Sequence, residues 1–169
     1  MKKYLVLYVF LFSFFGFAQN DIKEIQDVID VEVWKPFKKA FETLDGAALN
    51  AIYAENVLRV TPNGIDTKNS FKTKNLERFN QNKKDGVSIN LDFWFDSRYT
   101  NKTTSYEVGF YRIAFKNPKN ENAFSYGQFH IVLKKINGVW KIIQDWDTAT
   151  INGEKIDKID FEKQKPLPF

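Results

Sequence analysis

The chain contains a single histidine, His130, in a segment of alternating apolar and polar residues that is typical of a β-strand. The dipeptide Asn137-Gly138 follows, and both of its residues tolerate the positive φ angles of a type I′ hairpin turn. Counting outward from that turn places Asp145 opposite His130. A carboxylate that orients an imidazole can form a general-base dyad. The alternative is a cross-strand hydrogen bond on the outer face of a sheet, and the predicted register favours this alternative.

The other side chains capable of acid–base or metal chemistry give weaker signals. Asp92, Asp145 and Asp147 are predicted on the same outer face, where a solvated or interfacial role is simpler than a metal site. The chain has no cysteine, which excludes disulfides, thiol nucleophiles and thiolate metal sites. It also has no Gly-rich phosphate loop and no His-x-x-x-His pair. We therefore expect no metal, no cofactor and no catalytic residue on the sheet.

The inner face of the same predicted sheet is nearly all apolar and is the expected wall of a ligand pocket. Near the end of the last strand, Gln144 and Trp146 supply an amide and an indole, neither of which can act as a general base. An apolar pocket with a few hydrogen-bond donors suits an amphipathic or anionic small molecule. The alternative is a filled core in which Gln144 is satisfied locally. The candidate pocket residues are Gln144, Trp146, Tyr53, Arg112, Phe93, Phe110 and Phe129.

The outer face combines aromatic and ionisable side chains, a mixture that suggests a protein interface when it lies on an open sheet. We predict a homodimer contact there, formed by Trp94, Tyr111, His130 and Asp145.

The N-terminal residues have the pattern of a secretory signal peptide. Lys2 and Lys3 are followed by an apolar run and then by small residues that end at Ala18. The run is too short for a standard membrane-spanning helix, which needs about 20 residues. We predict cleavage after Ala18 and export to the periplasm or the medium, with no membrane association afterwards. Loss of the two lysines lowers the formal net charge from +4 to +2, so the basic character does not indicate a nucleic-acid partner.

The remaining sequence predicts the elements that would position these residues. We expect helices over 21–45, 47–54 and 67–83, the first of them kinked or restarted at Pro36. An extended segment is expected at 57–60, and strands at 87–100, 103–115 and on both sides of Asn137-Gly138. These elements form one domain over residues 19–150. A polar tail over 151–169 can dock a short helix through Ile156, Ile159 and Phe161.

Helices followed by a four-stranded antiparallel meander indicate the α+β class, with the helices packed on one face of the sheet. A turn at Asn101-Lys102 places Phe93 beside Phe110, and the Asn137-Gly138 turn places Phe129 beside Trp146.

Several of these segments together resemble SnoaL-like domains, which belong to the nuclear transport factor 2-like superfamily. The resemblance covers residues 24–150, and its most distinctive part is Gly138-Val139-Trp140-Lys141-Ile142. The other matching segments are Trp34–Ala40, Leu49–Asn56, Tyr106–Gly109, Tyr126-Gly127 and Asp145. The resemblance implies a cone, in which a strongly bent sheet wraps around helices and leaves a cavity at its wide end. It also implies frequent dimers through the outer sheet face. Relatives include ketosteroid isomerase, polyketide cyclases, the association domain of calmodulin-dependent kinase and many proteins without known activity.

Three functions fit these observations. The first is an exported domain that binds a small amphipathic or anionic molecule in the cone without catalysis, because the inner strands are predicted to lack an acid or a histidine. The second is an enzyme of the isomerase or cyclase type that uses an acid from the helical side, such as Glu55 or Asp66. The third is a structural dimerisation module.

Overall fold

The computed structural model describes residues 21–119 and 121–169, so the predicted signal peptide lies outside the described residues. The first helix runs from residue 21 through a π-helical turn, η1 (Asp30–Trp34), into α2 (Lys35–Glu42). Pro36 lacks an amide hydrogen, and its ring would clash with the carbonyl four residues earlier in a regular helix. The wider turn, in which the Lys35 amide donates to the Asp30 carbonyl, lets the helix continue past this proline.

Two more helices and the two strands between them lead from the first helix to the long strands of the sheet. α3 (Gly46–Ile52) begins at Asp45, whose side chain accepts a hydrogen bond from the Ala48 amide at 2.9 Å. It leads directly into β1 (Tyr53–Thr61), and a turn joins β1 to β2 (Gly64–Asp66). α4 (Ser70–Lys84) then precedes the long strands. No helix within residues 21–119 and 121–169 is both long enough and apolar enough to cross a membrane.

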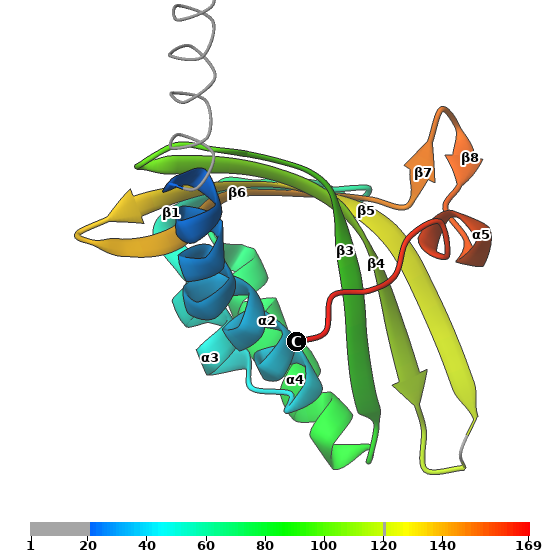
Figure 1. Ribbon diagram of the computed structural model, residues 1–169. Helices are drawn as coiled ribbons and strands as arrows, with labels where there is room; N and C mark the ends of the chain where they lie inside the picture. The colour runs from blue at the N-terminus through cyan, green and yellow to red at the C-terminus, as the bar shows by residue number, and fades with distance from the viewer. Residues whose placement is uncertain (1–20, 120) are drawn as a thin grey trace, which may run out of the picture.

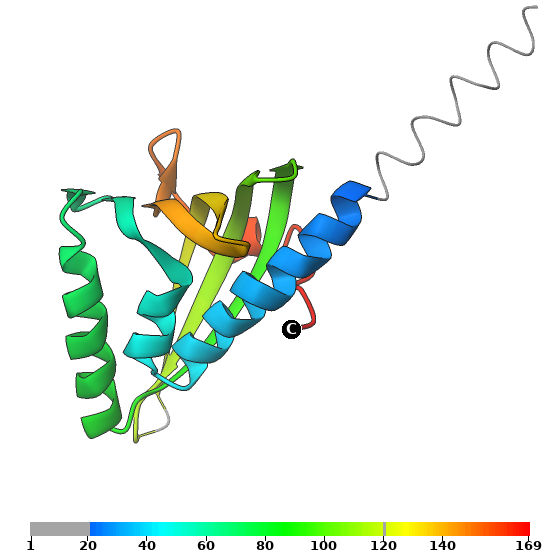
Figure 2. The ribbon, with the colours of Figure 1, turned by 90° about the vertical axis from the view of Figure 1, so that its left-hand side faces the viewer.

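The sheet contains β3 (Ser88–Thr100), β4 (Thr104–Lys116), β5 (Asn122–Ile136) and β6 (Val139–Thr148) as an antiparallel meander. β1 joins it parallel to β6, and the strand order is β2-β1-β6-β5-β4-β3. The sheet bends strongly around α2, α3 and α4, which all lie on its concave side (Figures 1 and 2). The predicted α+β class, with helices packed in a strongly bent sheet, is confirmed. The extended segment predicted at 57–60 belongs to β1.

The register of β5 and β6 follows the prediction only near the turn. Asn137 and Gly138 have φ angles of 51° and 85°, and Leu133 pairs with Ile142 as expected. A β-bulge at Ile143 then shifts the pairing by one residue. The predictions for the rest of β6 are therefore wrong, because Ile131 pairs with Asp145, Phe129 with Asp147 and His130 with Trp146.

The register of β3 and β4 is corrected for a related reason. The connecting loop is longer than the predicted two residues, since Thr100 pairs with Ser105, and this shifts the pairing by two residues. A bulge at Asp96 then shifts it back by one. Phe93 therefore pairs with Tyr111, and Trp94 with Phe110. Because side chains alternate between faces, the single-residue bulge moves every β4 side chain to the face opposite the predicted one.

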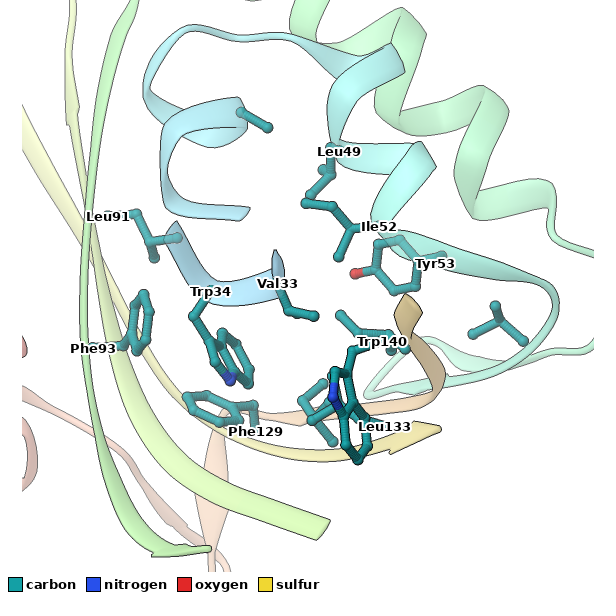
Figure 3. Packing of buried hydrophobic residues seen from close by; sticks show 14 of the residues in the cluster. Val33, Trp34, Leu49, Ile52, Tyr53, Leu91, Phe93, Phe129, Leu133 and Trp140 are labelled. Atoms are coloured by element: carbon teal, nitrogen blue, oxygen red, sulfur yellow. The ribbon is translucent and has the colours of Figure 1, made fainter. Parts of the chain in front are cut away.

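The main core lies between the concave face and the helices. Figure 3 shows Trp34 from η1 packed against Phe93 and Phe129, with ring centroids 5.3 Å from each. Tyr53, Leu133 and Trp140 close the core farther along. Burying aromatic side chains of this size is the main source of stability in a chain without disulfides.

Residues 150–169, called the C-terminal segment here, cover part of the convex face. β7 (Thr150–Ile151), β8 (Glu154–Lys155) and α5 (Lys158–Phe161) lie on the side of the sheet opposite the other helices (Figure 1). Ile156 and Phe161 are buried with Trp94 and Phe110 in a second cluster. Docking through Ile156 and Phe161 was expected, but Ile159 is 74% exposed and does not dock. The indole of Trp94 donates to the Phe161 carbonyl at 2.8 Å.

The end of this segment returns to the main core. It runs along the edge of β3, where the Leu167 amide donates to the Phe93 carbonyl at 2.9 Å. The Phe169 ring then packs against Phe93 at 5.7 Å between centroids, with the Lys35 ammonium above it. The C-terminal segment therefore covers one edge of the sheet as well as its convex face.

Candidate functional site

A cavity of about 280 Å³, called the cone cavity here, lies between the concave face of the sheet and the helices. Most of its wall is apolar and aromatic, which is typical of small-molecule sites. The apolar lining residues are Trp34, Phe37, Phe41, Leu49, Leu91, Phe93, Ile113, Phe115, Phe129 and Ile131.

A polar cluster interrupts this apolar wall. Arg59 donates from Nη1 to Asp145 and from Nη2 to Asp147, so one guanidinium holds two carboxylates. The Tyr53 hydroxyl donates to Asp145 Oδ2 at 2.6 Å. Tyr111 also lines the cavity. Asp145 and Asp147 are called the acid pair below.

The strand geometry explains why these groups meet. Residues two apart in a strand share a face, so Asp145 and Asp147 point to the same side of β6. The bulge at Ile143 makes that side the concave one, next to Ile131 and Phe129. β1 lies parallel to β6 with Arg59 opposite Asp145, which brings the guanidinium to the acid pair.

Burial and neighbouring charges raise the pKa values of three ionisable groups in the cavity wall, Asp147, Tyr53 and Tyr111. Burial and the nearby charge of Asp145 raise the pKa of Asp147 to about 7, and Arg59 opposes this shift. Asp147 is therefore present in both protonation states near neutral pH. Burial and the charge of Asp145 raise the pKa of Tyr53 well above its ordinary value, so that phenol stays protonated. Burial, followed by the charge of Asp147, also raises the pKa of Tyr111.

Tyr111 needs a glycine on the neighbouring strand. Gly127 pairs with Tyr111, and a Cβ placed on it would come within 2.4 Å of the Tyr111 hydroxyl oxygen. The same Cβ would lie 2.8 Å from the Thr148 carbonyl oxygen. Gly127 thus makes room for the phenol beside the acid pair.

A second polar network fixes the aromatic wall at Trp34. The indole Nε1 donates to Glu107 Oε2 at 2.6 Å, while Arg98 and Ser105 contact the other carboxylate oxygen at 3.0 and 2.8 Å. Burial raises the pKa of Glu107. Glu107 is fully buried, and the register of β4 turns it to the helical side.

The predicted pocket residues are divided between the two faces. Tyr53, Phe93 and Phe129 line the cone cavity as expected. The corrected registers place the other four outside it. Gln144 and Trp146 lie on the convex face of β6, paired with Val132 and His130. Phe110 and Arg112 lie under the C-terminal segment, where Arg112 pairs with Asp92 at 2.6 Å and lies over the Phe161 ring at 5.1 Å.

The predicted dimer residues are divided in the same way. Tyr111 and Asp145 face the cone cavity, and Trp94 is buried beneath the C-terminal segment. Only His130 remains on the open part of the convex face. Its Nδ1 lies 2.6 Å from the Tyr106 hydroxyl, and its ring centroid lies 4.6 Å from that of Trp146. A dyad of His130 with Asp145 is excluded, because the two side chains lie on opposite faces of the sheet.

Neither acid suggested from the helical side lines the cone cavity. Glu55 is exposed. Asp66 accepts hydrogen bonds from the Ser70 hydroxyl and from the amides of Lys68 and Phe71, and these bonds lower its pKa to about 2. Within residues 21–119 and 121–169, no cluster of His, Cys, Asp and Glu has the arrangement of a metal site.

The polar residues of the cavity wall that the sequence did not predict there are Tyr111, the acid pair, and Asn75 and Arg78 from α4. Two features of the sequence could have indicated the acid pair. Asp145 and Asp147 are two residues apart, so they share one face of a strand, and Arg59 is a cation within another, mostly apolar strand segment.

No family model and no curated protein matches the chain, but solved structures resemble it. A conserved protein from Planctomyces limnophilus has a TM-score of 0.62 and 16% identity, covering 74% of this chain and 96% of that chain. A nuclear transport factor 2-like protein of unknown function from Shewanella oneidensis has a TM-score of 0.55 and 20% identity, covering 73% and 98%. A ketosteroid isomerase-like protein from Erwinia carotovora atroseptica has a TM-score of 0.53 and 15% identity, covering 72% and 93%. The chain therefore has a nuclear transport factor 2-like fold.

Proposed function

We propose that this protein binds a small, mostly apolar molecule in the cone cavity and catalyses a proton shift on it, as an isomerase does. Asp147 carries the proton. The observation that supports this best is a carboxyl group with a pKa near neutrality in the wall of an aromatic cavity. Such a group can both accept and return a proton at working pH. Strongly shifted pKa values in a cleft are also typical of functional sites.

The residues of the cavity divide the work of such a reaction. Asp147, as the carboxylate, removes a proton from a carbon next to a carbonyl group, and negative charge develops on the carbonyl oxygen. The Tyr111 hydroxyl donates no hydrogen bond to another described residue, so it is available to that oxygen. The proton then returns from Asp147 to a different carbon of the same molecule, and no co-reactant is consumed. Arg59 holds the acid pair in place.

Binding without catalysis is the second candidate. The sequence favoured it because the inner face of the strands was expected to carry no acid. In the structure, however, β6 places two acids in the cavity wall. The specific observation that still favours it is that Arg59 already occupies an oxygen of Asp147. To act as a base, Asp147 would have to accept the substrate proton while Arg59 still holds one of its oxygens.

The two candidates differ in a measurement of carbon–hydrogen exchange. A panel of cyclic ketones and enones is incubated with the protein in deuterated water, and deuterium uptake is followed by NMR. Asp147→Asn should lower the rate of catalysed exchange by about 100-fold or more, because the proton carrier is lost. Gln144→Leu, on the convex face, is the matched control and should keep the wild-type rate. Equal rates for wild type and Asp147→Asn, together with thermal stabilisation by a ligand, would leave binding alone as the function.

We also propose that the protein is exported after cleavage at Ala18, which rests on the composition of residues 1–18. Intact-mass measurement on protein from the native host should give a chain that begins at Gln19.

A further inference from the structure

A second concave region adjoins the cone cavity. It is a groove of about 640 Å³ between the β1–β2 turn and the N-terminal half of α4. Arg59, Asn75 and Arg78 line both the groove and the cone cavity, so the two spaces meet at these side chains.

The groove carries a strong excess of positive charge. Four of its side chains are cationic, namely Arg59, Lys68, Lys74 and Arg78, and Asp66 is its only acid. The carboxylate of Asp66 is already engaged by the Ser70 hydroxyl and two backbone amides. Arg59 is engaged by the acid pair.

The other three cations have no carboxylate partner. Lys68, Lys74 and Arg78 form no ion pair within residues 21–119 and 121–169, although several other lysines and arginines of the fold do. Arg78 is held at the junction with the cone cavity, because its guanidinium lies 5.0 Å from the Phe79 ring centroid and 5.7 Å from that of Phe41. Like charges that face one concave surface attract an anion to it.

We infer that this groove binds the anionic end of the molecule whose apolar body occupies the cone cavity. The ligand is then an amphipathic organic anion, with a carboxylate, sulfonate or phosphate placed among Lys68, Lys74 and Arg78. This inference rests on the proposed function, since it assumes a ligand in the cone cavity. It adds the chemical class of that ligand and the residues that recognise its charge.

A matched pair of dyes separates the groove from the cavity. Anilinonaphthalene sulfonate and its uncharged parent, anilinonaphthalene, share an aromatic body and differ by one sulfonate group. Fluorescence titration should show the sulfonate binding at least about fivefold more tightly than the parent at low salt. This preference should shrink at about 0.5 M NaCl, where charge interactions are screened within roughly 4 Å. The affinity for the parent should depend little on salt.

Two double variants locate the effect. Lys68→Glu/Lys74→Glu changes exposed groove side chains and should weaken sulfonate binding by about tenfold while leaving the parent within about twofold. Lys83→Glu/Lys84→Glu makes the same charge change at the other end of α4 and should leave both affinities unchanged. If the parent binds and the sulfonate gains nothing from the groove lysines, the inference is wrong and the cone-cavity proposal stands. If neither dye binds, both proposals are contradicted.

Discussion

At the residue scale, the chemistry of the cavity depends on one arginine that serves two carboxylates. Arg59 alone cannot fully compensate the acid pair, because two negative charges face one positive charge in a poorly hydrated wall. Asp147 bears the imbalance, and its pKa rises toward neutrality. Residue type alone did not predict this. His130 is the most obvious candidate in the sequence, yet the structure places it on the opposite face, where burial lowers its pKa.

The raised pKa of Asp147 has a consequence for stability. In the unfolded chain this carboxyl titrates near its ordinary value of 3.8, and in the folded protein near 7. Between these values the folded state binds more protons, so the free energy of unfolding should fall as pH rises from about 4 to about 7. Urea unfolding at a series of pH values should show a shallower fall for Asp147→Asn than for wild type.

The control for this measurement is Asp96→Asn, an exposed aspartate at the β3 bulge, which should keep the wild-type slope. Identical slopes for Asp147→Asn and wild type would mean that Asp147 ionises in the folded protein as it does in the unfolded chain.

At the scale of the elements, the sequence did not predict β2, β7 or β8, but it predicted the longer helices, the four strands of the meander and the Asn137-Gly138 turn. These depend on local signals, namely periodicity, turn residues and proline. The two bulges could not be read in this way. Ile142 and Ile143 are both apolar, so either can point inward at little cost, and the choice is made by partners distant in sequence. Arg59 and Tyr53, which lie on β1, stabilise the register that turns Asp145 inward.

The two bulges decide which face of the sheet a residue lies on, and so which predicted positions were correct. Phe93 and Phe129 were assigned to the correct face because each alternates without interruption with its apolar neighbours on its own strand, Phe95 and Ile131, and the bulges lie at Asp96 and on β6. Residues beyond a bulge, such as Trp146 and Phe110, were assigned to the wrong face. A prediction that counts from turns is therefore reliable only as far as the first bulge.

Gly127 offers a test of the strand geometry behind the site. In Gly127→Ala the new methyl group would meet the Tyr111 ring and the Thr148 carbonyl, and one of them must move. We expect a loss of about 1–3 kcal/mol in the free energy of unfolding, as for other overpacked sites, together with weaker ligand binding in the cone cavity. Ser125→Ala, two residues away on β5 and exposed, should change stability by less than about 0.5 kcal/mol. Chemical denaturation of wild type and the two variants measures the free energy of unfolding. A wild-type value for Gly127→Ala would mean that Tyr111 does not lie over this glycine.

At the scale of the whole molecule, the chain covers part of its own sheet. The C-terminal segment covers Trp94, which the sequence predicted at a homodimer contact, together with Phe110. The part of the convex face that it leaves open carries Tyr106, His130 and Trp146, the last of them 41% exposed. We propose that any homodimer of the intact protein uses this open part.

Deletion of residues 150–169 should expose the second cluster and the edge of β3. The melting temperature should fall, and light scattering should show dimers or larger species, because apolar surface and an unpaired strand edge favour self-association. Replacing exposed Ile159 with Ser in the intact chain is the control and should leave mass and melting temperature unchanged. A truncated protein with the mass and melting temperature of the intact one would show that this cover adds nothing to stability or solubility.

The position of this cover in the chain also sets an order of events during biosynthesis. Every strand of the large sheet precedes residues 150–169, so the sheet leaves the ribosome first. At about 5–20 residues per second, synthesis of the segment takes on the order of one to four seconds. Trp94 and Phe110 therefore depend for their burial on residues that are synthesised after every strand of the large sheet.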